Sequence, residues 1–269
     1  MKIILNKNKL KKLINNQKNL GFVPTMGALH KGHISLIKKC ISQCDKSIVS
    51  IFVNKPQFNN KNDFKKYPRI VKKDITILKK LKVNYLYIPK ENQIYSKGQN
   101  KNITISSFQK KLCGKFRPGH FKAVVDVIDR FIKIIKPKRI FLGEKDMQQL
   151  LIINDFVKKN HKNVKVIACK TIREKNGIAL SSRNSLLSLK EKKISSKIYK
   201  LLKNSKYKIL KNKITLRSIK RKIHKFGVTK IDYIKILNIN KLIKPYIKNN
   251  RYKVFIAYYL RETRLIDNI

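Results

Sequence analysis

Short apolar segments alternate with segments of helical periodicity along the N-terminal part of this chain. Residues 47–53 (SIVSIFV) are β-branched and almost continuously apolar, as expected for a strand that is buried on both faces. Residues 33–44 instead space their apolar side chains three or four apart, which predicts a helix. Because parallel strands need crossover connections, this alternation predicts a parallel sheet with helices between its strands. In such a sheet a ligand binds beyond the carboxyl ends of the strands.

The same reasoning extends along the chain and predicts two domains. Further strands are predicted at 20–25, 84–89, 139–142 and 164–169, and further helices at 70–81, 121–135 and 146–158. After about residue 174 the rhythm changes to two lysine-rich helices followed by two strands, at 188–203, 215–225, 231–237 and 252–260. We therefore predict an α/β protein, with a Rossmann-like parallel-sheet domain over residues 1–174. A smaller C-terminal α+β domain over residues 175–269 is expected to close over the site.

The chain is strongly basic, with 66 Lys and Arg against 14 Asp and Glu and a formal net charge of +52. A basic surface can indicate a nucleic-acid partner, but these residues are mostly lysines dispersed over the whole sequence. Lys, Ile and Asn are enriched together, which is typical of an A/T-rich genome, so we expect no specific nucleic-acid partner. No apolar run approaches the roughly 20 residues of a membrane span. Four cysteines without a C-x-x-C pair indicate reduced thiols and a cytoplasmic location.

The string PTMGALHKGH, residues 24–33, follows a predicted strand and opens a predicted helix. Gly27 and Gly32 allow the backbone to approach a ligand closely, and a helix N-terminus suits phosphate. His30 and His33 are three residues apart, so both lie on one side of the first turn. They are able to donate hydrogen bonds to phosphate oxygens or to protonate a leaving group. The alternative is an ordinary strand–turn–helix with two surface histidines, and the P-T-M-G residues upstream argue against it.

Two further segments carry polar groups suited to a nucleotide. In GEKD (143–146), Gly143 removes a side chain where a nucleotide could lie, Lys145 offers a charge to phosphate, and Asp146 can accept hydrogen bonds. On its own this segment is better explained as a helix start with surface charges. SSR (181–183) places two hydroxyls and a guanidinium on one loop, which can neutralise departing pyrophosphate. The alternative for SSR is a cluster of N-capping serines.

These strings together resemble the pantothenate synthetase (pantoate–β-alanine ligase) family. H-x-G-H is similar to the signature of the nucleotidyltransferase superfamily, which is shared with class I aminoacyl-tRNA synthetases. The other blocks occur in family order and span nearly the whole chain: SIFVNKPQFNNKNDFKKYPR (50–69), RPGHF (117–121), FLGEKDMQQL (141–150), NGIALSSRN (176–184) and RLIDN (264–268). The departures are Lys55 followed by Pro56, with the proline one place later than usual, and Ala123, Asp126 and Asn176 at positions where the family has other residues.

The resemblance implies an ATP-dependent ligase that joins pantoate to β-alanine through a pantoyl-adenylate. It also implies a homodimer and Mg²⁺ bound with ATP, and no protein metal site is predicted. The implied catalytic residues are His33, His30, Lys145, Arg183 and Asn54. The implied ATP contacts are Met26, Gly27, Ala28, Leu29, His30, Lys31, Gly32, His33, Gly143, Glu144, Lys145, Asp146, Ile172, Leu180, Ser181, Ser182 and Arg183. Gln57 and Gln149 are implied to hold pantoate, and Arg117 and His120 of RPGHF to form part of a substrate wall.

Two other functions share part of this pattern. A nucleotidyltransferase of the same superfamily, acting on another small substrate without ligation, would have H-x-G-H but lack the two glutamine blocks. A basic RNA-binding protein derived from the same fold would tolerate the loss of His33 and Gln149, and both residues are present.

Overall fold

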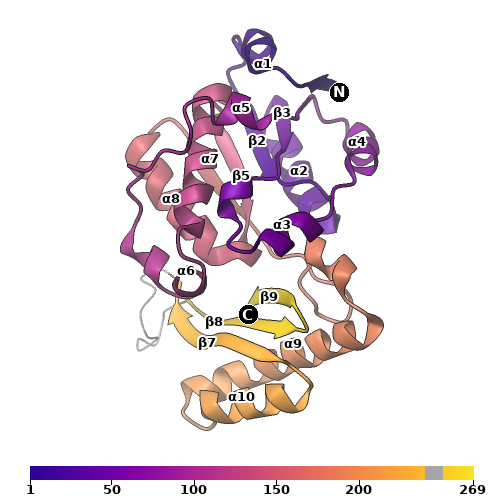
Figure 1. The fold of residues 1–269 in the computed structure, drawn as a ribbon, viewed down its shortest axis with the longest axis vertical. Coiled ribbons are helices and arrows are strands. Elements are labelled where there is room, and N and C mark those ends of the chain that lie inside the picture. The colour runs from indigo at the N-terminus through magenta and orange to yellow at the C-terminus, as the bar shows by residue number, and fades with distance from the viewer. Residues whose placement is uncertain (240–250) are drawn as a thin grey trace. The chain divides into compact units, whose positions relative to one another are not determined.

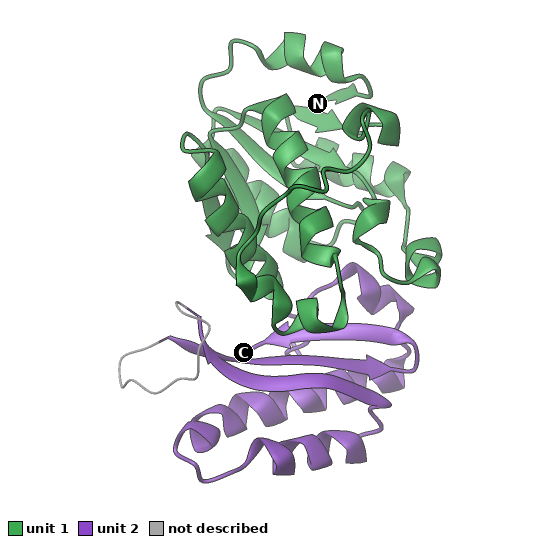
Figure 2. Cartoon of the chain, turned by 60° about the vertical axis from the view of Figure 1, so that its left-hand side comes forward, with its two compact units in different colours: residues 1–170 green, residues 171–269 purple. Residues whose placement is uncertain are grey.

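A computed structural model describes residues 1–239 and 251–269. The chain forms two compact units, Met1–Lys170 and Thr171–Ile269, which Figure 2 distinguishes by colour. The sequence analysis places the domain boundary four residues later, after residue 174, so the stretch 171–174 belongs to the second unit. No helix among the described residues is long and apolar enough to cross a membrane.

Unit 1 contains a six-stranded sheet in the order β1-β4-β3-β2-β5-β6, and every strand pair in it is parallel (Figure 1). The strands are β1 (Lys2–Ile4), β2 (Leu20–Thr25), β3 (Lys46–Ile51), β4 (Tyr85–Tyr87), β5 (Arg139–Gly143) and β6 (Lys165–Cys169). The predicted parallel sheet is therefore confirmed, and β1 is an additional strand that was not predicted. Because β2 lies between β3 and β5, the carboxyl ends of these three strands meet at the middle of one sheet edge.

Helices of unit 1 cover both faces of the sheet, as neighbouring residues of β2 demonstrate. Phe22 stacks on Phe131 of α7 with ring centroids 5.4 Å apart, whereas Val23 packs in a cluster with Ile37 and Cys40 of α2. Successive strand residues point to opposite faces, so α7 and α2 lie on opposite sides. The helices are α1 (Lys7–Ile14), α2 (Lys31–Gln43), α3 (Lys61–Lys66), α4 (Val71–Lys80), α5 (Glu91–Ile94), α6 (Cys113–Phe116), α7 (His120–Ile135) and α8 (Met147–Asn160), with 3-10 turns η1 (Lys55–Gln57), η2 (Ser107–Lys110) and η3 (Glu144–Asp146).

Helix α2 approaches β2 closely because Gly21 has no side chain. A Cβ atom at this position would lie 2.4 Å from Cys40 Sγ and 2.7 Å from Cys44 Sγ, far inside van der Waals contact. All four cysteines are free and buried. Cys40 and Cys44 are thus packing residues that hold α2 on the central strand.

Unit 2 is an α+β unit, which confirms the predicted class of the C-terminal domain. It comprises η4 (Ser182–Leu186), α9 (Leu189–Leu210), α10 (Leu216–Lys225), β7 (Lys230–Asn238), β8 (Tyr252–Leu260) and β9 (Thr263–Asn268). The strands form an antiparallel sheet in the order β7-β8-β9, and β9 was not predicted. Arg173 makes a bidentate ion pair with Asp267 of β9, at 2.7 and 2.8 Å, which ties the start of the unit to its last strand.

Candidate functional site

In the loop that follows the central strand β2, side-chain oxygens accept hydrogen bonds from the backbone amides and hold the loop in place. Thr25 Oγ1 donates to the carbonyl of Ser50 on β3 (2.6 Å) and accepts from Gly27 N (3.2 Å). Asp74 of α4 accepts from Ala28 N through Oδ2 and from Leu29 N through Oδ1, both at 2.8 Å. Three successive amides of the loop are therefore bonded within the protein.

Asp74 was missed by the sequence analysis although its position carries a signal. It is fully buried, and burial raises the pKa of its carboxyl group while the hydrogen bonds from Leu29 and Ala28 oppose that rise. It lies one turn before Leu78 on the apolar stripe of α4, where an unpaired carboxylate would be costly. A carboxylate on an apolar helix face therefore indicates a buried hydrogen-bond partner.

The contact with Asp74 stabilises an unfavourable backbone. Gly27 has φ of 78° and Ala28 has φ of 50°, in the left-handed region that alanine rarely adopts. The sequence analysis expects the backbone of this loop to approach a ligand, but the amides of Gly27, Ala28 and Leu29 are already used. In this loop, the groups left to meet an anion are therefore the N-terminus of α2 and the side chains around it.

His30 and His33 cap the N-terminus of α2 with their Nδ1 atoms. His30 Nδ1 accepts from Gly32 N at 3.1 Å, and His33 Nδ1 accepts from His30 N at 3.4 Å. A backbone amide can only donate, so in each neutral ring the proton must reside on Nε2. The ring centroids are 4.1 Å apart. The loop thus fixes two neighbouring imidazoles as Nε2–H donors.

Burial keeps both imidazoles neutral. It lowers the pKa of His33 to about 3, with further lowering by His30 and Lys145, and lowers that of His30 to about 4, with further lowering by Lys145. Asp146 partly opposes the shift at His30. Of the two roles considered from the sequence, hydrogen-bond donation fits these values, because neither ring carries a second proton near neutral pH.

Lys145 belongs to the turn after β5, the neighbour of β2 in the sheet. Its ammonium lies 3.4 Å from Asp146 Oδ1 and acts electrostatically on both histidines. At Gly143, just before it, a Cβ atom would meet no atom within 4 Å, so the space beside the strand end is open. The structure therefore places the predicted cation and an open strand end next to the two imidazole donors.

Gln57 follows β3 and is supported on both its side chain and its backbone. Its Oε1 accepts from Asn54 Nδ2 at 3.1 Å, and its Nε2 lies 3.3 Å from Met26 Sδ in the loop after β2. His120 Nδ1 lies 2.8 Å from the Gln57 carbonyl oxygen, so this nitrogen must be the protonated one. Arg117 donates to the same carbonyl at 3.0 Å and to His120 Nε2 at 3.1 Å. Arg117 and His120 thus position the backbone of Gln57.

The adjacent glutamines of α8 have different surroundings. Gln148 is buried and anchors the segment before α7, accepting from Cys113 N (2.9 Å) and donating to the carbonyls of Phe108 (3.0 Å) and Lys111 (2.6 Å). Gln149 is half-buried and is rotated by about 100° around the helix. The resemblance singles out Gln149, whereas the fold shows that Gln148 is already engaged within the protein.

The predicted ATP contacts of unit 2 form a loop of their own. Leu180 N donates to Ile172 O at 3.0 Å, and Ser181 Oγ accepts from Arg183 N at 3.3 Å, as the N-cap of η4. Ser182 and Arg183 then form the first residues of that turn and are partly exposed. The predicted serine N-cap is therefore present, and Arg183 lies beside it on the same turn.

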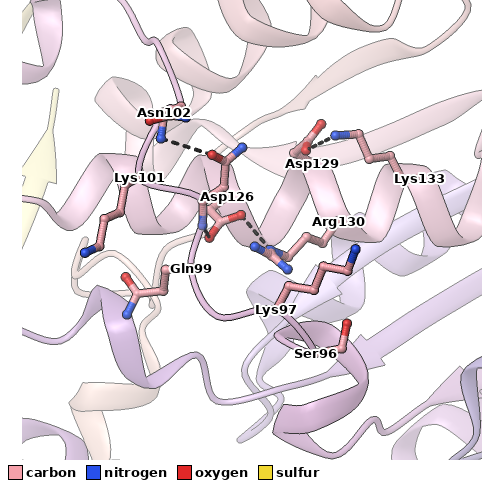
Figure 3. A pocket seen from close by; sticks show the side chains of 10 residues that line it. Ser96, Lys97, Gln99, Lys101, Asn102, Asp126, Asp129, Arg130 and Lys133 are labelled. Carbon is pink, nitrogen blue, oxygen red and sulfur yellow. Dashed lines mark hydrogen bonds and ion pairs between the residues drawn. The ribbon is translucent and has the colours of Figure 1, made fainter.

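A pocket of ≈ 610 Å³ lies away from these residues, and no residue predicted to bind ATP or pantoate lines it (Figure 3). Its lining comes from the segment before η2 and from α7: Ser96, Lys97, Gln99, Asn100, Lys101, Asn102, Asp126, Asp129, Arg130 and Lys133. Asp126 bonds Arg130 Nε (2.6 Å) and Asn100 N (3.0 Å), and Asp129 bonds Lys133 (2.6 Å) and His161 (2.7 Å). Both carboxylates are thus paired within the protein, and we interpret the polar residues of this pocket as structural.

Comparison with known proteins agrees with this arrangement. The family model of pantoate-beta-alanine ligase matches residues 2–269. The chain belongs to the pantoate–β-alanine ligase family. The pantothenate synthetase of Endomicrobium trichonymphae is 43% identical over 276 residues, covering 100% of this chain and 97% of the relative. That of Thermodesulfovibrio yellowstonii is 39% identical over 257 residues, covering 94% and 91%.

Solved structures of the family share the fold over the full length. The pantoate-beta-alanine ligase of Francisella tularensis, crystallised with beta-gamma ATP and β-alanine, aligns with a TM-score of 0.86 at 39% identity, covering 100% of this chain and 97% of that one. A pantothenate synthetase structure from Thermus thermophilus gives a TM-score of 0.89 at 30% identity, covering 100% and 99%. This chain thus has the length and the architecture of the family.

We expect the rings of His30 and His33 to stay neutral and protonated on Nε2 down to about pH 5. The physical reason is burial, which lowers their pKa values to about 4 and about 3. Because the unfolded chain binds these protons near pH 6.5, stability should fall as pH decreases from there toward the folded-state values. ¹⁵N NMR of labelled histidine measures the pKa of each ring and identifies the nitrogen that carries the proton. The urea-unfolded protein is the control. A folded-state midpoint near 6.5, or protonation on Nδ1, would contradict the assignment.

Replacing Asp74 by Asn should loosen the loop after β2. The new NH₂ group cannot accept, so one of the amides of Ala28 and Leu29 loses its partner, at a cost of about 1–3 kcal/mol. We expect the KM for ATP to rise at least about fivefold with a smaller change for pantoate. The matched control is Asp129→Asn, another buried carboxylate, in α7, which should lower stability without changing the KM for ATP. An equal rise of the KM for ATP in both variants would contradict the role of Asp74 in holding the loop.

Proposed function

We propose that the protein condenses pantoate with β-alanine at the expense of ATP, giving pantothenate, AMP and pyrophosphate through a pantoyl-adenylate. The observation that carries this proposal is the family match over residues 2–269, which includes the H-x-G-H and both glutamine blocks. The geometry of unit 1 supports it, because donors from β2, β3 and β5 lie at adjacent strand ends. The Francisella tularensis relative, crystallised with beta-gamma ATP and β-alanine, supports ATP as the co-substrate.

In the first half-reaction a carboxylate oxygen of pantoate attacks the α-phosphorus of ATP. An oxygen–phosphorus bond forms, the bond to the β-phosphate breaks, and pyrophosphate leaves with the electron pair. The Nε2–H groups of His30 and His33 donate to phosphate oxygens as their charge develops, and Lys145 adds a positive charge. Such donors are effective because their orientation is fixed before the substrate arrives. Arg183 of unit 2 neutralises pyrophosphate, a role that rests on the family resemblance.

In the second half-reaction the unprotonated amine of β-alanine attacks the acyl carbon of the adenylate. A carbon–nitrogen bond forms, the acyl–phosphate bond breaks, AMP leaves with the electron pair, and the nitrogen releases one proton to solvent. Gln57 and Gln149 hold the pantoyl group, and Asn54 assists by orienting Gln57. The amide side chains offer hydrogen bonds without introducing a charge that would repel the carboxylate.

The remaining assignments belong to the same proposal. The predicted ATP contacts in the loop 26–33, in the turn 143–146 and in the unit 2 loop bind the nucleotide. Mg²⁺ accompanies ATP and is held by its phosphates and by water. Among residues 1–239 and 251–269 there is no group of three or more His, Cys, Asp or Glu that could hold a metal, so we assign no protein ligand. We also propose a cytoplasmic homodimer without a specific nucleic-acid partner.

The alternative of a nucleotidyltransferase acting on another small substrate is not favoured. Such an enzyme needs the adenylation donors but has no use for the pantoate-binding glutamines, whereas here Gln57 is supported by four side chains. The resemblance to pantothenate synthetases also extends through unit 2.

The purified protein should exchange labelled pyrophosphate into ATP with pantoate present and β-alanine absent. The reason is that adenylation is reversible and precedes entry of the amine. Measuring the label in ATP, with and without each substrate, tests the order of the steps. Exchange that requires β-alanine would contradict the two-step mechanism, and exchange without pantoate would favour the alternative function.

The variant Gln149→Glu should weaken pantoate binding by about 100-fold, equivalent to about 3 kcal/mol, and leave ATP binding within about twofold. An ionised glutamate only accepts hydrogen bonds, and its charge repels the carboxylate of pantoate. Calorimetry with each ligand measures the two affinities. Gln43→Glu, at an exposed glutamine of α2, makes the same change of charge and should alter neither. If ATP affinity collapses while pantoate affinity holds, Gln149 belongs to the nucleotide site.

A further inference from the structure

Tyr95, which follows the short helix α5, is joined to Gln57 through Asn54. Its hydroxyl lies 2.6 Å from Asn54 Oδ1, and Asn54 Nδ2 lies 3.1 Å from Gln57 Oε1 and 3.2 Å from the carbonyl oxygen of Ala123. Asn54 is 1% exposed, so water does not compete for these bonds. The three side chains form one hydrogen-bonded row that ends in the candidate pantoate site.

This row has a single possible direction. The carbonyl of Ala123 can only accept, so the NH₂ group of Asn54 must face it. Asn54 Oδ1 then faces Tyr95 and requires a donor, which the phenol hydroxyl supplies. The same NH₂ group donates to Gln57 and thereby fixes its Oε1 as the accepting end. The Nε2 end of Gln57 is left beside Met26 Sδ, a weak acceptor, at 3.3 Å.

Tyr95 is itself held in place from the other side. The Arg130 guanidinium lies over its ring, 4.7 Å from the centroid, and the Phe52 ring lies 6.4 Å away. Arg130 is fixed by Asp126, whose carboxylate it reaches in Figure 3, and by the carbonyls of Ile94 and Gly98, each at 2.8 Å. Burial, with a smaller contribution from Asp126, raises the pKa of Tyr95, so its hydroxyl stays protonated and able to donate.

We propose that Tyr95 is a positioning residue that, together with the Ala123 carbonyl, holds the Gln57 amide in one orientation toward the substrate. Both groups act through Asn54, and together they commit Gln57 to presenting an NH₂ donor. That donor matches the carboxylate and hydroxyl oxygens of pantoate and disfavours an ammonium group, such as that of β-alanine, at the same place. The inference rests on the proposed function and adds to it a residue that does not touch the substrate.

The decisive comparison is between Tyr95→Phe and Tyr87→Phe. Each removes one tyrosine hydroxyl, but the buried hydroxyl of Tyr87 on β4 makes no hydrogen bond within residues 1–239 and 251–269. In pantoate-dependent pyrophosphate exchange, Tyr95→Phe should raise the KM for pantoate about tenfold, the size expected for a lost buried hydrogen bond. The KM for ATP should stay within about twofold. Tyr87→Phe should change neither constant by more than about twofold.

A second measurement separates positioning from a general loss of structure. In a Gln57→Ala background, Tyr95→Phe should have almost no further effect on the KM for pantoate, because its action passes through Gln57. Three outcomes would each overturn the inference. They are effects of Tyr95→Phe and Gln57→Ala on the KM for pantoate that multiply in the double variant, an unchanged KM for pantoate in Tyr95→Phe, and equal rises of the KM for pantoate and for ATP. If the folded wild type and Tyr87→Phe show no exchange at all, the proposed function itself fails and this inference falls with it.

Discussion

The buried carboxylate of Asp74 accepts the backbone amides of Ala28 and Leu29, and the candidate site is arranged around the loop that this contact holds. The chain turns from β2 into α2 with Gly27 and Ala28 at positive φ, which costs energy at alanine. Two charge-assisted hydrogen bonds offset this cost and the desolvation of the carboxylate. With the turn fixed, Met26 Sδ lies next to Gln57 Nε2, and His30 is the N-cap of α2.

Backbone groups decide which atoms of the site carry hydrogen. The amides of Gly32 and His30 occupy Nδ1 of the two imidazoles and leave Nε2–H as the donor. The carbonyl of Gln57 selects the Nδ1–H form of His120, and the carbonyl of Ala123 orients Asn54. Because a backbone N–H can only donate and a C=O can only accept, these directions follow from the fold.

The site therefore relies on neutral donors in a chain whose formal net charge is +52. Burial and the nearby Lys145 both disfavour a charge on His30 and His33, so the local positive charge is concentrated on the ammonium. Neutral donors are less costly to bury than cations and keep their geometry without a counter-ion.

The sequence by itself determined the order of the main strands and longer helices and the identity of the family. Strong periodicity located β2, β3, α4, α7 and α8 to within a few residues, because their apolar faces must be buried wherever they pack. The three-residue strand β1 was not predicted, because its strand geometry depends on pairing with β4, which is far away in sequence. The motif around His30 and the family resemblance identified His30, Lys145 and Gln57 as candidates. Their companions Asp74 and Tyr95 belong to none of these motifs, and Gln148 lies in the block 141–150 but was assigned no role there.

Only the tertiary structure decided how those candidates are held. Asp74 lies 46 residues from Ala28 in sequence, and Tyr95 lies 41 residues from Asn54, so no local pattern pairs them. It also decided that Gln148 anchors a loop whereas Gln149 does not, since a helix turns by about 100° per residue. A sequence specifies which side chains are available for chemistry. The direction of each hydrogen bond is determined only when folding brings distant backbone donors and acceptors against them.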